Sequence, residues 1–515
     1  MEAISPRPAD PPGPVIDVHN PATGEKIGQV PVRSTEEVRA AVARAREAQK
    51  SWAQLSLGER CRRILWLRDA ILDRRQDLAD TIMRETGKPR IEALAHEVAV
   101  MADVLGVYAS KAPEWLAPRT VDVGKLVHRQ GYAYYAPKGV VGVISPWNFP
   151  FMLAMSPASA AVVAGNAIVI KPSEVTPLVM LLAKEIWDAS GLPPDLMQVV
   201  TGDGRTGAAL IDAGIDHMVF TGAVATGRKV AAACGERLVP CTLELGGKAA
   251  AIVCDDADVD RTAKALVWGA FANSGQACVC VERVYAHEAV HDRLVERVLE
   301  LTRKLRQGDP ADDEKEIGAM VLPRQVEIVE RLLADAVAKG AKIVLGGARG
   351  PGPGRFFQPT VVTGVDHSME IMRDEIFGPV MPIMKVKGER EAIDLANDSH
   401  LGLSGYVFTR DREHGRRLAE RIHTGSVQVN DTMSFFGVAD APFGGVKASG
   451  FGKVRGPEGM RELCELRHVH YDRLSPLRHE LWWFPYTRTN LRAAMRALPA
   501  IMGGGGIVKR LKSLF

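Results

Sequence analysis

The chain has 515 residues, of which 46% are hydrophobic and 25% are charged, and its formal net charge is +3. This composition is typical of a soluble protein with two to four domains, and it excludes global disorder, a collagen-like repeat and a polytopic membrane protein. Lys and Arg (65) nearly balance Asp and Glu (62), so the net charge gives no reason to expect a nucleic-acid partner.

The sequence favours a cytoplasmic location. The first twenty residues are rich in proline and lack the basic and apolar regions of a secretory signal. Seven cysteines, an odd number without regular spacing, favour a reducing compartment over a disulfide framework. The uncharged stretch 139–170 contains three prolines, so we expect it to form buried strands and turns and not a membrane span.

The N-terminal part of the sequence is expected to be helical. Ser34 is a suitable N-cap for a helix that continues to Ser51. Amphipathic stretches predict further helices at about 58–84 and 88–112, the last of which ends before Pro113. Roughly alternating apolar and polar residues then predict a hairpin over 126–135 that leads into a buried strand.

The rest of the sequence predicts an α/β fold. Short apolar runs that alternate with helices indicate βαβ units and parallel sheets covered on both faces. The first sheet is expected to extend to about residue 245, and a second α/β region from Gly246 to about Gly450. The predicted strands are 140–145, 167–171, 198–201, 217–221, 249–253 and 342–345, and the predicted helices are 176–190, 205–213 and 226–236.

Three segments at predicted strand ends are candidates for binding a nucleotide. Residues 202–207 fit the pattern G-x-G-x-x-G, but no acidic residue follows at the usual distance, and a plain tight turn is an alternative. Residues 220–227 pass from strand to helix with glycines that let backbone amides face an anion. Lys171 and Glu174 can hydrogen-bond ribose hydroxyls, although such a pair alone is more often part of a solvated turn.

Three further segments carry groups suited to covalent catalysis. Cys278 follows a glycine-containing bend, and no histidine lies within eight residues of it, which gives no support to a Cys–His protease. Glu244 precedes two glycines, as suits a mobile general base, and Asn148 lies between two prolines, where its amide can stabilise an oxyanion. Each has an ordinary alternative, namely a packed cysteine, a surface glutamate and a turn asparagine.

Seven motifs occur together in one order, and through them the chain resembles the aldehyde dehydrogenase superfamily from about Asn20 to Arg473. The motifs are PWNFP (146–150), KPSE (171–174), FTG…TG (220–227), ELGGK (244–248), NSGQAC (273–278), EIFGPV (375–380) and PFGGVKASG (442–450).

The resemblance implies catalytic roles for three residues. Cys278 corresponds to the nucleophile that attacks the aldehyde carbon, and Asn148 with the backbone amide of Cys278 would hold the negative oxygen. Glu244 corresponds to the base that activates water. The expected reaction is oxidation of an aldehyde to the carboxylic acid by NAD(P)+, through a thiohemiacetal and a thioester. Similar enzymes that pass the acyl group to coenzyme A usually lack a glutamate at this position, so Glu244 favours hydrolysis. Transfer of the acyl group to coenzyme A is the alternative reaction.

The resemblance also implies NAD as the cofactor, with NADP as the alternative, and no metal ion. A carboxylate near the ribose 2′-hydroxyl repels a 2′-phosphate, so Glu174 favours NAD. Ala223 stands where the family commonly has serine, so one contact to a phosphate is missing. The cofactor-binding candidates are Lys171, Glu174, Ser145, Trp147, Gly202, Gly222, Gly227, Glu375 and Phe377.

The family architecture has three parts. In this chain they would be a Rossmann-like cofactor domain (1–120 and 138–245), a catalytic α/β domain (246–455) and an oligomerisation β-flap (121–137 and 456–473). A flap of two or three strands is marginally stable alone and needs a partner surface. We therefore expect a homodimer or a homotetramer.

The substrate is a small-molecule aldehyde that the sequence does not specify further. Phe151, Met152 and Met155 follow Asn148 and favour an aliphatic or aromatic aldehyde. No arginine clamp for a second carboxylate is evident, yet one can come from residues 432–441, so succinate semialdehyde stays open, as does a non-catalytic binding relic of the fold. Cys280 is either a redox partner of the nucleophile or a pocket-lining residue.

Residues 474–515 form a basic aromatic tail beyond the family core. It contains the sequence LWWFPY (481–486) and seven Lys and Arg against one Glu, a net charge of +6. Two interpretations stay open. The tail contacts an anionic membrane surface, which would make the enzyme membrane-associated, or its aromatic residues pack on a partner subunit or beside the substrate entrance.

Overall fold

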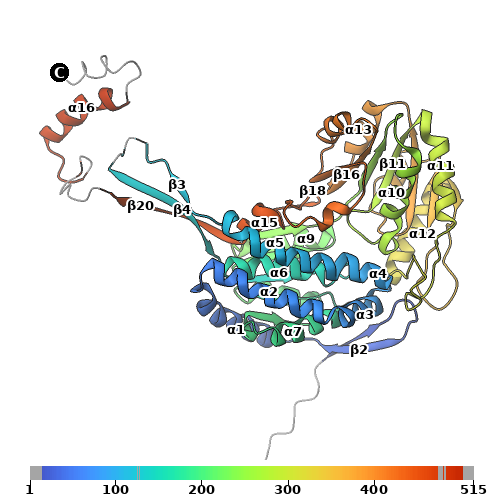
Figure 1. The fold of residues 1–515 in the computed structure, drawn as a ribbon, viewed down its shortest axis with the longest axis horizontal. Coiled ribbons are helices and arrows are strands. Elements are labelled where there is room, and N and C mark those ends of the chain that lie inside the picture. The colour runs from blue at the N-terminus through green and yellow to red at the C-terminus, as the bar shows by residue number, and fades with distance from the viewer. Residues whose placement is uncertain (1–13, 125, 127, 474–479, 481–482, 503–515) are drawn as a thin grey trace, which may run out of the picture. The chain divides into compact units, whose positions relative to one another are not determined.

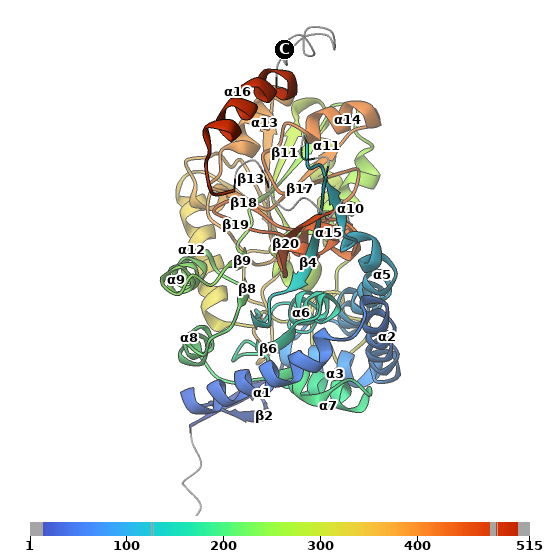
Figure 2. The same ribbon diagram turned by 90° about the vertical axis from the view of Figure 1, so that its left-hand side faces the viewer.

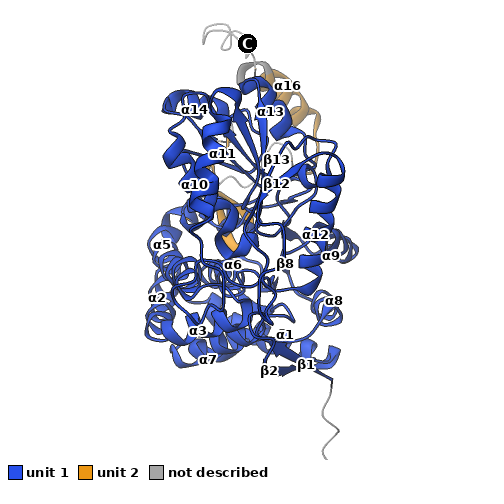
Figure 3. Ribbon diagram, turned by 90° about the vertical axis from the view of Figure 1, so that its right-hand side faces the viewer, with its two compact units in different colours: residues 1–116, 137–465 blue, residues 117–136, 466–515 orange. Residues whose placement is uncertain are grey.

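The computed structural model describes residues 14–124, 126, 128–473, 480 and 483–502. The chain divides into two compact units, residues 1–116 with 137–465 and residues 117–136 with 466–515, which Figure 3 colours blue and orange. Within the described ranges, no helix is long and apolar enough to cross a membrane.

The N-terminal helices of the first unit differ from the prediction in two places. Stretch 58–84 forms two helices that are separated at Arg74, and stretch 88–112 contains a π-helical turn, η1 (Ala93–Ala99). Pro113 does not end the last helix as predicted but lies inside it, near its end at Trp115. The proline removes one backbone hydrogen bond, and the helix continues for only two residues beyond it. The helices are α1 (Thr35–Ala53), α2 (Leu57–Asp73), α3 (Arg75–Thr86), α4 (Arg90–Glu92) and α5 (Val100–Trp115), and the hairpin β1 (Val15–His19) and β2 (Lys26–Pro31) precedes them.

The first large sheet has six strands in the order β19-β9-β8-β5-β6-β7, all parallel except β19. Figure 2 shows α8 and α9 on one side of it and α6 on the other, and Figure 1 shows α6 and α9 from the side. The strands are β5 (Val140–Ile144), β6 (Ala167–Lys171), β7 (Met197–Val199), β8 (His217–Thr221), β9 (Cys241–Glu244) and β19 (Gly450–Phe451), and the helices are α6 (Met152–Ala164), α7 (Leu178–Ala189), η2 (Pro194–Leu196), α8 (Gly204–Asp212) and α9 (Val224–Glu236).

This strand order has a switch point between β5 and β8. The chain passes outward from β5 through β6 to β7 and then returns to β8 on the other side of β5. In open α/β sheets, ligands bind in the crevice outside the carboxyl ends of the strands at such a point. Asn148 follows the end of β5, and Gly222 follows the end of β8, so the topology brings two of the predicted site segments together.

The second sheet has seven strands in the order β12-β13-β14-β11-β10-β16-β17. It is parallel except for the β12–β13 pair. Alternate residues of β10 enter two apolar cores, Ala249 and Ala251 on one face and Ala250 and Ile252 on the other, as a strand covered on both faces requires.

Its strands are β10 (Ala249–Val253), β11 (Val281–His287), β12 (Lys342–Leu345), β13 (Thr360–Thr363), β14 (Val380–Val386), β16 (Ser404–Phe408) and β17 (Ser426–Val429). The helices are α10 (Val259–Phe271), η3 (Ala272–Gly275), α11 (Glu288–Thr302), α12 (Pro323–Ala338), η4 (Glu370–Met372), α13 (Glu389–Asn397), α14 (Arg412–Ala419) and η5 (Ser434–Gly437). The small pair β15 (Leu401–Gly402) and β18 (Val446–Lys447) and helix α15 (Gly456–Glu462) complete the unit. All six predicted strands and the three helices predicted among them are confirmed.

The second unit contains a three-stranded sheet in the order β20-β4-β3, with β3 (Arg119–Val121), β4 (Arg129–Pro137) and β20 (Cys464–Asp472). It corresponds to the predicted flap, although helix α15, which the prediction assigned to the flap, lies in the first unit. The acidic residue of the tail, Glu480, is buried and accepts a hydrogen bond from Arg129 (2.6 Å). Helix α16 (Arg488–Met502) follows. Trp482 and the basic residues after 502 lie outside the described residues.

Candidate active site

A cavity of about 460 Å³ lies at the switch point of the first sheet, and we call it the glycine-lined cavity. It is bounded by the ends of β5, β8 and β9, by the nucleophile loop and by the start of α12. Seven of the residues predicted from the sequence line it, namely Trp147, Asn148, Gly222, Glu244, Cys278, Glu375 and Phe377.

The loop that carries Cys278 has an unusual backbone. Asn273 (φ 51°) and Ser274 (φ 54°) are in the left-handed region, which costs free energy for residues with a side chain and is concentrated at functional sites. The loop also packs on main chain: a Cβ on Gly275 would lie 2.1 Å from the Gly378 carbonyl oxygen, and one on Gly247 would lie 2.0 Å from that of Cys278. These glycines allow three motifs to meet without intervening side chains.

A buried ion pair supports the segment that contains Asn148. The Lys88 ammonium donates to Glu97 (2.7 Å) and to the Asn148 carbonyl (2.7 Å), and both side chains of the pair are fully buried. Glu97 in turn accepts from the backbone amides of Phe151 and Met152 at the start of α6. The sequence analysis missed this pair; the only available signal was a charge on the buried face of a predicted helix.

A second buried carboxylate supports the nucleophile loop. Glu92 accepts from the backbone amide of Asn273 at 2.9 and 3.1 Å, and the Asn273 side chain donates to the Asn148 carbonyl (3.0 Å). Burial raises the pKa of Glu92 to about 7. The nucleophile loop and the Asn148 segment are therefore fixed relative to each other by hydrogen bonds.

The geometry leaves a donor available for a developing negative oxygen. The Asn148 side-chain amide donates one hydrogen bond, to the Gln276 carbonyl (3.0 Å), and an amide NH₂ has two donors. The backbone amides of Cys278 and Val279 lie close enough to the Cys278 sulfur to lower its pKa. The arrangement is that of an oxyanion site beside a nucleophile.

Burial governs the charges of the two reactive groups. Desolvation raises the pKa of the Cys278 thiol to about 12, and the charges of Glu375 and Glu244 add to this effect. Desolvation also raises the pKa of Glu244 well above its usual value, while Lys453 and Arg455 oppose the shift. Neither carboxylate oxygen of Glu244 has a hydrogen-bond partner among the described residues, so no hydrogen bond fixes the position of this carboxylate.

The loop that carries Glu375 and Phe377 is held by a buried pair. Glu282 forms an ion pair with Lys248 (2.8 Å) and accepts from the backbone amides of Ile376 and Phe377. Glu375 accepts from the backbone amide of Gly247 (2.7 Å), and desolvation raises its pKa to about 8. The Phe377 ring packs edge-on against Trp147 at 5.4 Å.

The remaining cofactor-binding candidates do not line this cavity. Lys171 is buried and pairs with the exposed Glu174 (3.0 Å), and the buried Ser145 hydroxyl has no partner among the described residues. Gly227 lies in α9 and packs against Leu245. Gly202 lies in the turn before α8, where a Cβ would clash with Thr206.

A second, smaller hollow of about 150 Å³ lies on the other side of the nucleophile, and we call it the apolar hollow. Cys278 is the one described residue that lines both it and the glycine-lined cavity. The predicted pocket residues Phe151, Met152 and Met155 are not on its wall, because α6 turns them into the core, where all three are fully buried. The wall consists of His96, Val100, Phe149, Trp268, Ala277, Cys278, Val279, Met433, Ser434, Phe436 and Gly437.

Two α/β sheets that meet at a cysteine, with a glycine-lined crevice at the switch point, define an oxidoreductase of the dinucleotide-dependent class. The sequence model named "Aldehyde dehydrogenase family" matches residues 9–469, and the chain belongs to this family. It is an NAD- or NADP-dependent aldehyde dehydrogenase, and solved relatives include enzymes described with either cofactor.

Individual relatives cover most of the chain. The 4,4'-diapolycopene aldehyde oxidase of a Methylomonas species is 39% identical and covers 95% of this chain and 92% of its own. The mitochondrial succinate-semialdehyde dehydrogenase of Arabidopsis thaliana is 39% identical, and the match covers 88% of this chain and 85% of that enzyme. The structure of an NAD-dependent aldehyde dehydrogenase from Sinorhizobium meliloti superposes with a TM-score of 0.87 at 35% identity. The superposition covers 92% of this chain and 93% of that one. The match to the Methylomonas enzyme covers 95% of this chain, which is more than residues 1–473 alone can supply. The match therefore extends into the tail.

Proposed function

We propose that this protein oxidises an apolar aldehyde to the carboxylic acid, with Cys278 as nucleophile, Asn148 as oxyanion donor and Glu244 as base for hydrolysis. The observation that carries the proposal is the position of Cys278, which lines both the glycine-lined cavity and the apolar hollow. A nucleophile between two cavities can bind an aldehyde that enters from one side, and the carbon of the resulting thiohemiacetal can pass its hydride to a cofactor on the other side.

The glycine-lined cavity fits a dinucleotide. Helix α9 begins beside it without a side-chain cap, because its N-cap is Ala223, so its first amides are free to bind a phosphate. The orphan Ser145 hydroxyl and the Lys171–Glu174 pair lie at the ends of the adjacent strands β5 and β6, where they would bind ribose and phosphate oxygens. When bound, the dinucleotide supplies a nicotinamide ring that accepts the hydride.

The chain's own groups perform the other steps. The Cys278 thiol loses its proton to solvent and its sulfur bonds to the aldehyde carbon, while Asn148 and the Cys278 backbone amide stabilise the negative oxygen. Departure of the hydride restores the carbonyl as a thioester on Cys278. Glu244 then removes a proton from water, the water oxygen bonds to the acyl carbon, and the sulfur–carbon bond breaks to release the acid.

The wall of the apolar hollow favours an uncharged substrate. Among its described residues, His96 is the single group that can become a cation, and burial lowers its pKa to about 4. The wall itself therefore offers no cationic side chain to a semialdehyde carboxylate. The Lys88 ammonium and the Arg455 guanidinium lie behind it, 4.0 and 4.8 Å from the ring centroids of Phe149 and Phe436. The similarity to the Arabidopsis succinate-semialdehyde dehydrogenase nevertheless makes that substrate the second candidate.

Production of the reduced nicotinamide over a panel of aldehydes tests this function. The panel includes short and long alkanals, benzaldehyde and succinate semialdehyde, each with NAD and with NADP, and with coenzyme A as a further addition. Cys278→Ala should abolish turnover, whereas Cys280→Ala, two residues away and lining neither cavity, should retain it. No turnover with any aldehyde, or turnover that survives Cys278→Ala, would identify a binding relic or another nucleophile.

We also propose that the protein is a homodimer or homotetramer joined through the β20-β4-β3 sheet. This three-stranded sheet has a mainly exposed β20, and so small a sheet needs a partner surface for stability. Light scattering should give a mass of two or four chains, and a monomer would contradict the proposal.

For the tail, we propose contact with an anionic lipid surface through α16. Leu491, Met495, Leu498 and Met502 are each more than half exposed and share one face of the helix. Arg488, Arg492 and Arg496 flank that face, and the helix contains no acidic residue. An apolar stripe beside a row of arginines is typical of interfacial helices, in which each cation contributes about 1 kcal/mol near an anionic surface.

Vesicle flotation distinguishes the two interpretations of the tail. The full chain should float with vesicles that contain an anionic lipid and not with neutral ones, and Leu491→Asp with Met495→Asp should abolish this. Ala493→Asp, on the opposite face of the helix, is the matched control and should still float. If the double variant instead changes the mass measured by light scattering and no protein floats, the face packs on another subunit.

A further inference from the structure

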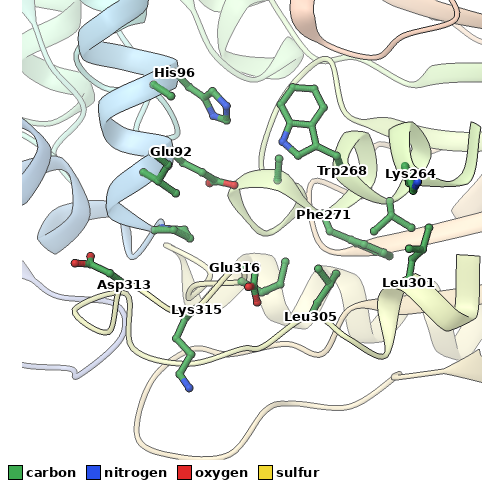
Figure 4. Close-up of a pocket in the computed structure, with 16 residues that line it drawn as sticks. Glu92, His96, Lys264, Trp268, Phe271, Leu301, Leu305, Asp313, Lys315 and Glu316 are labelled. Carbon is green, nitrogen blue, oxygen red and sulfur yellow. The ribbon is translucent and has the colours of Figure 1, made fainter. Parts of the chain in front are cut away.

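A third hollow of about 480 Å³ adjoins the apolar hollow, and we call it the outer hollow (Figure 4). It lies between helices of the two α/β halves of the first unit, with walls from α4, η1, α10, α11 and residues 313–317. Its apolar side chains include Ile91, Ala95, Trp268, Phe271, Leu301 and Leu305. Nothing in the reaction described above uses it.

The two hollows share one pair of residues. His96 and Trp268 line both, and their rings pack edge-on at 5.8 Å. Figure 4 shows the two rings facing each other across one end of the outer hollow. His96 lies in the π-helical turn η1, a feature often found at functional sites. The path from Cys278 outward therefore passes this pair.

The chemistry of the outer hollow is that of a binding surface for hydrocarbon. Each charged side chain on its wall already has a partner. Glu92 accepts a hydrogen bond from the backbone amide of Asn273. The other four form the ion pairs Lys264–Asp260, Asp313–Arg90, Lys315–Asp312 and Glu316–Arg306. In Figure 4 the Lys315 ammonium points away from the centre. Ile91 is 66% exposed and Trp268 40% exposed, so large apolar surface is left open on this wall.

We propose that the outer hollow binds the distal hydrocarbon chain of an extended apolar aldehyde whose carbonyl carbon lies at Cys278, and that His96 and Trp268 determine access to it. The inference rests on the proposed function and names its substrate class. A short aldehyde would fill only the apolar hollow, whereas a long one would continue past the pair and bury further methylenes. Each buried methylene should raise kcat/KM up to about fourfold.

A tryptophan placed in the outer hollow tests the proposal. Ala95 lines the outer hollow and not the apolar hollow, so Ala95→Trp should fill the outer one without touching the reacting centre. Ala99→Trp is the matched control, because Ala99 is also an exposed alanine of η1 and lines neither hollow. The measurement is kcat/KM for straight-chain aldehydes from butanal to hexadecanal, with Ala95→Phe as a second variant.

The wild type and Ala99→Trp should share a profile that rises with chain length. Ala95→Trp should lower kcat/KM for hexadecanal about tenfold or more, while butanal changes by less than about twofold. Identical profiles for the two tryptophan variants, or an equal loss for butanal and hexadecanal in Ala95→Trp and Ala95→Phe, would overturn the proposal. Failure of the proposed function looks different, because then the wild type oxidises none of these aldehydes or Cys278→Ala remains active.

Discussion

The two cavities that meet at Cys278 are built from different material. The glycine-lined cavity is bounded by main chain at strand ends and by Glu375, whose carboxylate accepts a hydrogen bond from the backbone amide of Gly247. The apolar hollow is bounded mainly by apolar side chains, among them Phe149, Met433 and Phe436, which make no side-chain hydrogen bonds within the described part of the chain.

From this difference we expect the glycine-lined cavity to determine the rate of the chemical steps and the apolar hollow to determine which aldehydes bind. Hydrogen-bonded loops keep their geometry when a side chain nearby changes, whereas an apolar wall changes its shape with every substituted residue. We therefore expect substitutions on the glycine-lined side to change rate for all aldehydes alike, and substitutions on the apolar side to change the order of preference among aldehydes.

The largest effect on the glycine-lined side is expected for Glu244→Gln. Loss of the base should slow hydrolysis of the thioester by about 10²–10⁴-fold, the usual range for a general base. Formation of the thioester does not need this base, so one reduced nicotinamide per active site should still appear in a rapid burst. Rapid-mixing absorbance measures both phases. Loss of the burst together with steady turnover would assign Glu244 to the first step instead.

Asn148→Ala should lower kcat/KM by about 10²–10³-fold, because one oxyanion donor is removed. The loss should be the same for butanal and hexadecanal, since the amide acts at the carbonyl and not on the chain. Because Asn148 is buried, thermal unfolding of the variant serves as the control for folding. A loss below about tenfold, or one that depends on chain length, would contradict this role.

The same difference in material explains what the sequence could predict. The glycine-lined side is made of contiguous motifs. Asn148, Glu244 and Cys278 were candidates from their local patterns, Glu375 and Phe377 came from the resemblance to the family, and all five line this cavity. The alternation of strands and helices predicted both sheets. Glycines and charged residues in a local pattern carry that information without knowledge of the tertiary fold.

The apolar side has no such pattern. Its wall combines residues from η1, α10 and the segment around η5, which are far apart in the chain. Neighbours in sequence were a poor guide here: Phe151 and Met155 follow Asn148, yet α6 carries them into the core. The Lys88–Glu97 pair was missed because its two members are nine residues apart and belong to no local motif, and their contact at 2.7 Å exists only in the folded structure.

The pH dependence of the burst rate should also be determined by groups of the glycine-lined cavity. The reactive forms are the Cys278 thiolate and the Glu244 carboxylate, and burial raises the pKa of both, that of Cys278 to about 12. The Cys278 thiol is therefore protonated at neutral pH, and the burst rate should rise up to about tenfold per pH unit as the pH increases. In Glu244→Gln the charge that raises the thiol pKa is absent, so the rise should begin at lower pH. A profile that is flat, or that falls with pH, would show that the thiol ionises by another route.

The smallest effect is expected at the edge of the glycine-lined side, where Glu174 is exposed and pairs with Lys171. If this carboxylate lies near the ribose 2′-oxygen, it repels the 2′-phosphate of NADP and leaves NAD unaffected. A single charge at about 4 Å in water is worth about 1 kcal/mol, or about fivefold. Glu174→Gln should therefore raise kcat/KM for NADP about fivefold and leave the value for NAD within about twofold, with butanal as substrate. Glu185→Gln, an exposed glutamate of α7, is the matched control and should change neither value. An equal change for both cofactors would mean that Glu174 acts on a part of the dinucleotide that NAD and NADP share.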